Sequence, residues 1–285
     1  MTITPHLLAS GPGWRVTDFV CNAGPEDRPF EEQHGNVSIA AVTAGTFQYR
    51  TESGSAVLSP GALLLGNPGA CFECGHEHAG GDRCLSFHYS AEHFEAIVAD
   101  MPGVRSAAFA VPRLPPVPAL MPLLAAAEAA RGHHDAAELE ELALRIAGAV
   151  AALVTGSGCD QSASRVDDER RVTAALRRIE QNAHEPLALA VLAREAAMSP
   201  YHFLRTFRRV VGMTPHQYVL RTRLHWAAVR LRSSIDPIST IAFDAGFDDL
   251  STFNRRFRRV MGESPGAFRA RRTSAVVLTF RSVSR

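Results

Sequence analysis

A thirteen-residue segment near the C-terminal end of the sequence occurs twice, fifty positions apart. Residues 203–215 and 253–265 share two phenylalanines, three arginines, a valine, a glycine and a proline at equal spacing. In each copy the phenylalanines and the valine fall at i, i+4 and i+7, which places them on one stripe of a helix and the arginines on the other side. The glycine, with the proline three residues later, ends each helix. Two basic helices of this kind predict contact with two places on one polyanion, and we expect that polyanion to be double-stranded DNA.

Charge is distributed unevenly along the chain. Residues 1–164 hold 8 arginines against 18 acidic residues, a net charge of −10, whereas residues 165–285 hold 22 arginines against 11, a net charge of +11. An acidic half joined to a basic half indicates a nucleic-acid-binding module attached to a separate regulatory or catalytic body. The chain has no lysine, and the planar guanidinium group of arginine is the better partner for phosphate and guanine.

The length of 285 residues and the hydrophobic content of 46% suffice for two domains with separate cores. The N-terminus has no basic segment followed by an apolar run, and no apolar stretch approaches the roughly 20 residues of a membrane span. We therefore expect a cytoplasmic protein without a membrane partner. An odd number of cysteines, five, favours reduced thiols over a disulfide framework.

The N-terminal half alternates short β-rich runs with turns between residues 37 and 89. The runs 37–42, 46–51, 56–58 and 62–65 are each followed by a turn that contains glycine. This spacing is typical of a small antiparallel barrel or sandwich.

Helical periodicity follows over residues 91–100 and 120–154, and the break at residues 132–134 divides the second stretch into two antiparallel helices. The latter helix carries an apolar seam, which predicts either a dimer face or packing against the chain's own barrel. The seam consists of Leu139, Leu142, Ile146, Val150 and Leu153.

The Gly- and Ser-rich stretch 155–165 is typical of an interdomain linker. It predicts a sensor and dimerisation domain over residues 1–154, a helical DNA-binding domain over 166–272 and a tail over 273–285. Helices are expected over 167–182, 187–197, 200–211, 215–232, 238–245 and 250–261.

Each duplicated helix follows a short apolar helix and a tight turn, which is the helix-turn-helix plan. Ser199 and Asp249 stand where the N-cap of each duplicated helix should be. The second turn is one residue longer, and Gly246 can take the positive φ that such a turn needs.

Two stretches of the C-terminal part resemble the AraC/XylS family of bacterial transcription regulators. They are the Ser-Pro-Tyr-His-Phe-Leu-Arg-Thr-Phe run from Ser199 and the segment from Ile238 to Pro265, with its Ile-Ala-Phe-Asp-Ala-Gly-Phe core and final Gly-Glu-Ser-Pro. The resemblance covers about the last hundred residues. It implies two helix-turn-helix units joined by a long helix and bound to adjacent major-groove segments, with RNA polymerase as a partner and activation as the outcome.

The outward sides of the two duplicated helices predict how each residue would contact DNA. Base readout is expected early in each helix, because a recognition helix enters the groove N-terminus first, at Tyr201, Leu204, Arg205, Ser251, Asn254 and Arg255. Phosphate contacts, which position the protein without reading sequence, are expected one turn later at Arg208, Arg209, Arg258 and Arg259. The alternative for these four arginines is a solvated face. Arg205 and Arg255 are the best candidates for bidentate contacts with guanine.

A segment rich in cysteine and histidine runs from Cys71 to His88. On a strand, His76 and His78 would share a face, and together with Cys74 they form a tentative site for zinc or another transition metal. One alternative is a redox-sensing or electrophile-sensing thiol at Cys71 or Cys74. The other is that these side chains are ordinary barrel residues that bind each other or water.

The N-terminal half also resembles a cupin-like sensor domain, at Ser59-Pro60-Gly61 and Asn67-Pro68-Gly69. The resemblance implies a pocket for a small-molecule effector. Cupin enzymes take metal ligands from a His-x-His pair, a Glu and a later His; here His34 stands alone where the first motif should be, and the His-x-His pair comes late. The expected fold is therefore an α+β multidomain protein, with a cupin-like antiparallel β-barrel and helical hairpin followed by an all-α domain with two helix-turn-helix motifs.

Together these features predict a sequence-specific DNA-binding transcription regulator that is not an enzyme. An effector or metal at the barrel would alter a homodimer or free the DNA-binding domain, which requires different affinities for two states. The alternative is a cupin-type metalloenzyme fused to a DNA-binding domain, for which the sequence offers no nucleophile with a base and an orienting partner. A further alternative is a DNA-repair fusion in which Cys71, Cys74 or Cys84 accepts an alkyl group.

Overall fold

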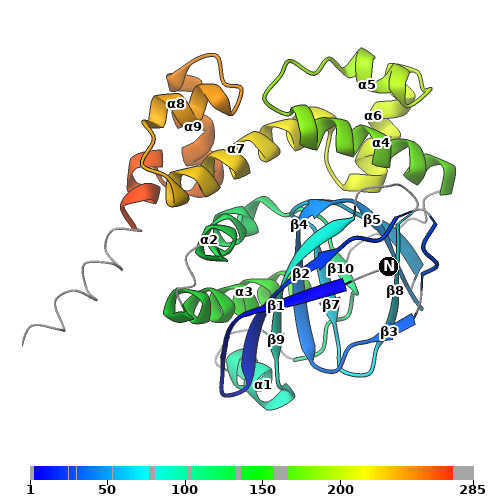
Figure 1. The fold of residues 1–285 in the computed structure, drawn as a ribbon, viewed down its shortest axis with the longest axis vertical. Coiled ribbons are helices and arrows are strands. Elements are labelled where there is room, and N and C mark those ends of the chain that lie inside the picture. Colours follow the sequence, from blue (N-terminus) through cyan, green and yellow to red (C-terminus); the bar gives the residue numbers. More distant parts are fainter. Residues whose placement is uncertain are drawn as a thin grey trace, which may run out of the picture.

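The computed structural model has a β-rich N-terminal part, over which the C-terminal helices form a layer (Figure 1). It describes residues 3–24, 26–29, 31–52, 54–76, 81–99, 101, 104, 106–131, 136–156 and 166–271. The predicted linker beyond residue 156 and the predicted tail lie outside the described residues, so the predicted domain boundaries stay predictions.

Two antiparallel sheets make up the N-terminal part, in agreement with the predicted β-rich class. The six-stranded sheet has the order β1 (Ile3–Gly11), β2 (Trp14–Cys21), β9 (Asp82–Tyr89), β4 (Val37–Gly45), β7 (Leu63–Gly66), β10 (Arg113–Leu114). The four-stranded sheet has the order β3 (Glu31–Gln33), β8 (Cys71–Gly75), β5 (Phe47–Thr51), β6 (Gly54–Leu58).

The four predicted β-rich runs are confirmed as β4, β5, β6 and β7. The hairpin of β1 and β2 was not predicted. Strand β1 lies at the edge of its sheet and exposes much of its length, so it lacks the regular apolar alternation that identifies a half-buried strand.

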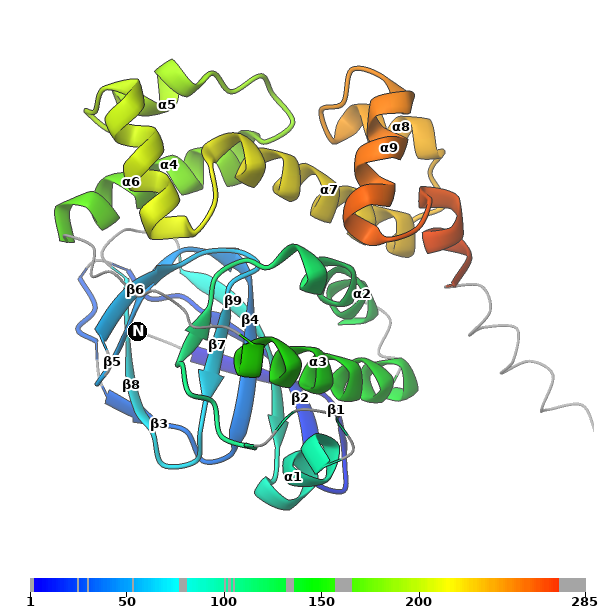
Figure 2. The same cartoon turned by 180° about the vertical axis from the view of Figure 1, so that it is seen from behind.

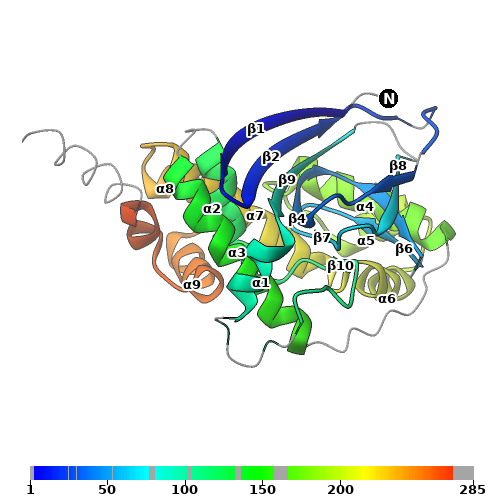
Figure 3. The ribbon, with the colours of Figure 1, turned by 90° about the horizontal axis from the view of Figure 1, so that it is seen from below.

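Three helices, α1 (Ala91–Ala99), α2 (Met121–Arg131) and α3 (Ala136–Gly156), cover one face of the six-stranded sheet, and a short 3₁₀ helix at Pro118–Leu120 precedes α2. Figure 3 shows α3 beside β1. In the predicted seam, Leu139, Leu142, Ile146 and Val150 are at most 2% exposed and pack with core residues of the sheet, and Leu153 packs partly buried against them. The seam is therefore not a dimer face, because the apolar face of the sheet requires this cover, and the alternative of packing on the chain's own sheet is confirmed.

The C-terminal part forms two helical clusters joined by a long helix (Figure 2). The first contains α4 (Val166–Asn182), α5 (Leu189–Glu195) and α6 (Pro200–Val211); the connector is α7 (Pro215–Ser233); the second contains α8 (Ile238–Asp244) and α9 (Leu250–Met261). The predicted helices are confirmed with boundary shifts of a residue or two. The core phenylalanines are confirmed as buried, with Phe203, Phe207, Phe253 and Phe257 at 0% exposure.

The predicted ends of the duplicated helices are confirmed. The side chain of Ser199 accepts a hydrogen bond from the backbone N–H of His202, and that of Asp249 accepts one from Thr252. Gly212 and Gly262 end α6 and α9 in the left-handed conformation, both at φ 83°. Gly246 has φ 87°, and a Cβ there would lie 2.4 Å from the carbonyl oxygen of His184, so both conformation and space require glycine.

The connector α7 starts with a capping box, in which Oγ1 of Thr214 accepts from the N–H of Gln217 and Oε1 of Gln217 accepts from the N–H of Thr214. We expect Thr214→Ala to lower the free energy of unfolding by about 1 kcal/mol, because one terminal N–H of the helix loses its acceptor. Urea denaturation of the full chain measures this. Thr214→Ser keeps the hydroxyl and should behave as the wild type, and equal losses in both variants would contradict a capping role.

Within the described residues, no helix combines the length and apolar character needed to span a membrane. Cys21, Cys71, Cys74 and Cys84 are free thiols, and the fifth cysteine, Cys159, lies outside the described residues.

Candidate functional site

Helices α6 and α9 lie on the same side of the connector α7, one near each end (Figure 2; seen from below in Figure 3). The sequence places the same residue types on both helices, and the caps described above fix where each helix begins. Of the predicted base-reading residues, Arg205, Ser251, Asn254 and Arg255 are exposed and Leu204 is half-buried. The side chain of Tyr201 lies outside the described part of the structure.

Arginines of the C-terminal part differ in how they are held. Several are fixed by carbonyl or carboxylate oxygens: Arg221 by Pro60, Arg223 by Ala183, Glu185 and Gly246, Arg230 by Asp236 and Asp244, and Arg232 by Glu138. In contrast, Arg205, Arg208, Arg258 and Arg259 are exposed and make no ion pair or hydrogen bond with any described residue. Cations that are fixed stabilise the fold, whereas exposed, unpaired cations on two helices are available to phosphates and bases.

Arg209 departs from this arrangement. Its Nη2 donates to Oδ2 of Asp168 on α4 at 2.5 Å, while its counterpart Arg259 in the second copy has no described partner. A phosphate contact by Arg209 through this nitrogen would compete with its contact to Asp168.

A cavity of about 150 Å³ lies between the two sheets. Aromatic and aliphatic side chains line it together with a concentration of thiols, imidazoles and carboxylates: Cys21, Cys74, Cys84, His34, His76, His88, Glu32 and Asp82. Two predicted metal ligands, Cys74 and His76, therefore share the cavity, while His78 lies outside the described residues. Cys21 was missed because it ends β2, which the sequence did not predict; the apolar residues Trp14, Val16 and Val20 at even spacing were the available signal.

Burial sets the protonation of these groups. Loss of hydration raises the pKa of the Cys74 and Cys84 thiols well above the usual value, and the nearby carboxylate of Asp82 adds to this effect. The same loss of hydration lowers the pKa of His34 and of His88 to about 4. Protonated thiols are poor nucleophiles, which disfavours both electrophile sensing and alkyl transfer at these cysteines.

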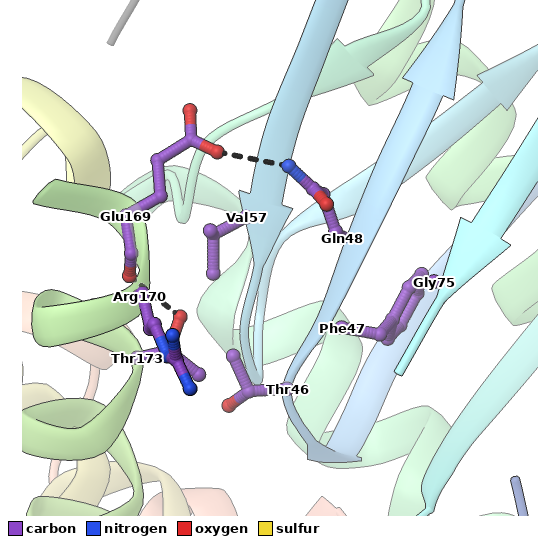
Figure 4. A pocket seen from close by; sticks show the side chains of 8 residues that line it. All are labelled: Thr46, Phe47, Gln48, Val57, Gly75, Glu169, Arg170 and Thr173. Carbon is purple, nitrogen blue, oxygen red and sulfur yellow. Dashed lines mark hydrogen bonds between the residues drawn. The ribbon is translucent and has the colours of Figure 1, made fainter. Parts of the chain in front are cut away.

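A polar seam, which was not predicted from the sequence, joins the β domain to the helical layer. Oε1 of Glu180 on α4 accepts from Oγ1 of Thr46 at 3.4 Å and from the hydroxyl of Tyr218 on α7 at 3.1 Å. Gln48 on β5 donates to Oε2 of Glu169 on α4 at 3.2 Å (Figure 4). Nη1 of the buried Arg221 donates to the carbonyl of Pro60 at 2.6 Å.

Phe47 connects the cavity to this seam. Its side chain borders the cavity between the sheets and also the hollow against α4 that Figure 4 shows with Glu169 and Thr173. Its ring stacks on the imidazole of His76, with centroids 5.8 Å apart and planes inclined by 25°. A change at His76 is thus one side chain away from the surface that holds α4.

Comparison with known proteins matches two family models to the chain: an AraC-like ligand binding domain over residues 22–147 and a helix-turn-helix domain over residues 192–271. The regulatory protein SoxS of Salmonella typhimurium is 37% identical over 93 residues, which are 33% of this chain and 87% of SoxS. The bifunctional transcriptional activator/DNA repair enzyme Ada of Escherichia coli is 35% identical over 102 residues, which are 35% of this chain but only 27% of Ada. Among solved structures, the DNA-binding domain of AdpA in complex with a target DNA is 28% identical and covers 37% of this chain and 95% of that chain, with a TM-score of 0.36.

Proposed function

The chain belongs to the AraC family of DNA-binding transcription regulators, and from this premise we propose that α6 and α9 read a bipartite DNA site under the control of the cavity in the β domain. The observation that carries the proposal is that the duplicated helices α6 and α9 both carry exposed arginines without described partners, Arg205, Arg208, Arg258 and Arg259, whereas Arg221, Arg223, Arg230 and Arg232 of the connector α7 are held by the fold. Base readout would come from Tyr201, Leu204, Arg205, Ser251, Asn254 and Arg255, with Arg205 and Arg255 contacting guanine. Phosphate contacts would come from Arg208, Arg209, Arg258 and Arg259.

Control of DNA binding would pass through the polar seam between the β domain and the helical layer. An effector in the cavity would bear on His76 and Phe47, and Phe47 borders the surface that contacts Glu169 on α4. A ligand that favours one packing of Phe47 would therefore shift the balance between two placements of the DNA-binding layer. The effector itself is a small molecule or an ion small enough for a cavity of about 150 Å³.

The setting of this function is the cytoplasm, where the chain would act on promoter DNA and, as an activator, on RNA polymerase. Ada, a relative over part of this chain, carries the name of a transcriptional activator. A homodimer would use a surface other than the seam on α3, since those leucines and their neighbours are buried against the sheet.

No catalytic step forms part of this proposal. The match to Ada covers 27% of that protein, so its repair activity does not pass to this chain by similarity. The high pKa of the Cys74 and Cys84 thiols also disfavours alkyl transfer.

Salt dependence tests the proposed phosphate contacts. We expect Arg258→Ala/Arg259→Ala to reduce the slope of log affinity against log salt by about 1 per arginine, because fewer counterions leave the DNA on binding when a phosphate contact is missing. The preferred DNA sequence should stay the same. Binding to a DNA site selected from a random pool with the wild-type chain, at several salt concentrations, measures this.

Arg145→Ala is the control, because it removes one arginine from an exposed position on α3, outside the two duplicated helices. Its slope should equal that of the wild type. An unchanged slope in the Arg258→Ala/Arg259→Ala variant would instead assign these arginines to a solvated face.

A further inference from the structure

Cys21, His76 and Asp82 meet at the wall of the cavity between the sheets. The thiol sulfur, a ring nitrogen and a carboxylate oxygen all lie within 4.8 Å of one another. Nε2 of His76 contacts Oδ2 of Asp82, and these two side chains are only 3% and 9% exposed. Sγ of Cys84 lies 3.5 Å from Oδ1 of the same carboxylate. Three groups with sulfur, nitrogen and oxygen donors therefore converge at one place in the cavity wall.

The backbone holds these groups in place. Cys21 ends β2 and faces Asp82, which begins β9, in direct register, and His76 follows the last residue of β8 on the other sheet. A Cβ on Gly81 would lie 2.1 Å from the carbonyl oxygen of Cys21, and one on Gly45 would lie 2.3 Å from the carbonyl oxygen of Gly81. Because the segments pack this closely, strand ends rather than a free loop fix the ligand positions.

This donor set suits one class of cation. Zinc takes thiolate, imidazole and carboxylate ligands in tetrahedral sites, at about 2.3 Å to sulfur and about 2.0–2.2 Å to nitrogen and oxygen, and the three donor atoms already lie within 4.8 Å of one another. Magnesium and calcium prefer sites made of oxygen ligands. Asp82 and Cys84 are two residues apart on β9, which puts their side chains on the same face of the strand.

We propose that Cys21, His76 and Asp82 bind a divalent cation of the zinc class. The proposal rests on the proposed function in taking this cavity as the effector site, and it names the class of effector. It replaces the sequence-based ligand set of Cys74, His76 and His78: Cys74 lines the cavity from β8 but is not part of the three-ligand group.

Such an ion also has a route to the DNA-binding layer. Binding would exchange the contact of His76 with Asp82 for a bond to the metal and so turn the imidazole against the ring of Phe47, on which it stacks. Phe47 borders the hollow against α4. Metal-bound and metal-free chains would therefore differ in how the polar seam between the β domain and α4 packs.

Cobalt(II) titration tests the site in the full chain, stripped with chelator and kept reduced without oxygen. Cobalt substitutes for zinc in tetrahedral sites, and thiolate ligation gives it a charge-transfer absorption band. The band should saturate at one equivalent per chain and should be lost in Cys21→Ser and in Asp82→Asn. Cys71→Ser, on β8 but not among the residues that line the cavity, and Cys74→Ser should both retain the band.

Several outcomes would overturn the proposal. They are the absence of a band in the wild type, an unchanged band in Cys21→Ser, and a band lost in Cys74→Ser but not in Cys21→Ser, which would restore Cys74 as the ligand. Circular dichroism and a thermal melt of each metal-free variant show whether it folds. Where a variant does not fold, its cobalt titration is replaced by a measurement of the zinc bound per wild-type chain, with and without prior alkylation of the thiols. DNA binding by the metal-free chain is measured separately, so failure of the metal site and failure of the regulator are distinguishable.

Discussion

Alanine at both Arg205 and Arg255 is expected to reduce the affinity of the chain for its DNA site by roughly 10² to 10⁴-fold. Each residue occupies the exposed side of the early part of a recognition helix, at the same position of the duplicated segment. A bidentate contact between arginine and guanine contributes about 1–3 kcal/mol of discrimination. The two contributions should add, because α7 separates the two helices and the arginines share no described partner.

The measurement compares two kinds of DNA at one salt concentration. Fluorescence anisotropy gives the affinity for a selected site and for DNA of random sequence, with the wild type, Arg205→Ala/Arg255→Ala, and Arg208→Ala/Arg258→Ala. The first variant should lose affinity mainly for the selected site. The second is the matched control, because it removes the same charge one helical turn later and should weaken binding to both DNAs alike. Equal losses on both DNAs in the Arg205→Ala/Arg255→Ala variant would make these arginines phosphate contacts.

The recognition helices could be predicted from sequence almost to the residue because their signals are local. The stripe of Phe253 and Phe257, the Asp249 cap and the left-handed Gly262 all lie within fourteen residues of one another. Each of them acts through a neighbour three or four positions away, and such contacts follow from helix geometry alone. The same local rules apply to α6, which is why both copies are confirmed.

The remaining features depend on contacts between residues far apart in the chain. Cys21 reaches His76 only because β2 pairs with β9 and the two sheets face each other. The seam joins Thr46 to Glu180, which are 134 positions apart. The apolar stripe on α3 was visible in the sequence, but the sheet that covers it was not, so the sequence left two alternatives open. Long-range pairing has no periodic signature, and the residues involved show their role only in the fold.

Glu180, in the polar seam between the β domain and the helical layer, is a buried carboxyl group with a raised pKa. Its carboxyl group is removed from water between α4, α7 and Thr46, and this loss of hydration raises its pKa to about 7, although hydrogen bonds from Tyr218 and Thr46 oppose the shift. The group is therefore protonated in the folded chain at pH 6 and ionised at pH 8. Ionisation places a negative charge where the β domain meets the DNA-binding layer.

The contribution of Glu180 to folding stability should therefore fall as pH rises through this range. Below about pH 4.5 the carboxyl group is protonated in both the folded and the unfolded chain and has no effect. Between 4.5 and 7 the unfolded chain releases this proton first, so the contribution of Glu180 to the free energy of unfolding decreases with rising pH. Above about pH 7 both states are ionised and the loss levels off at about 3 kcal/mol, the equivalent of the change in pKa.

Glu180→Gln is expected to remove this loss, because the amide cannot ionise and its oxygen can still accept from Tyr218 and Thr46. Urea denaturation should give the variant a free energy of unfolding about 3 kcal/mol above that of the wild type at pH 8, and a much smaller difference at pH 5. The difference between the proteins isolates Glu180, since His34 and His88 titrate in both. Glu195→Gln, the same change at an exposed position on α5, is the control and should show little difference at either pH. A variant less stable than the wild type at pH 8 would mean that Glu180 is ionised and stabilising in the seam, and that the seam tightens rather than loosens as pH rises.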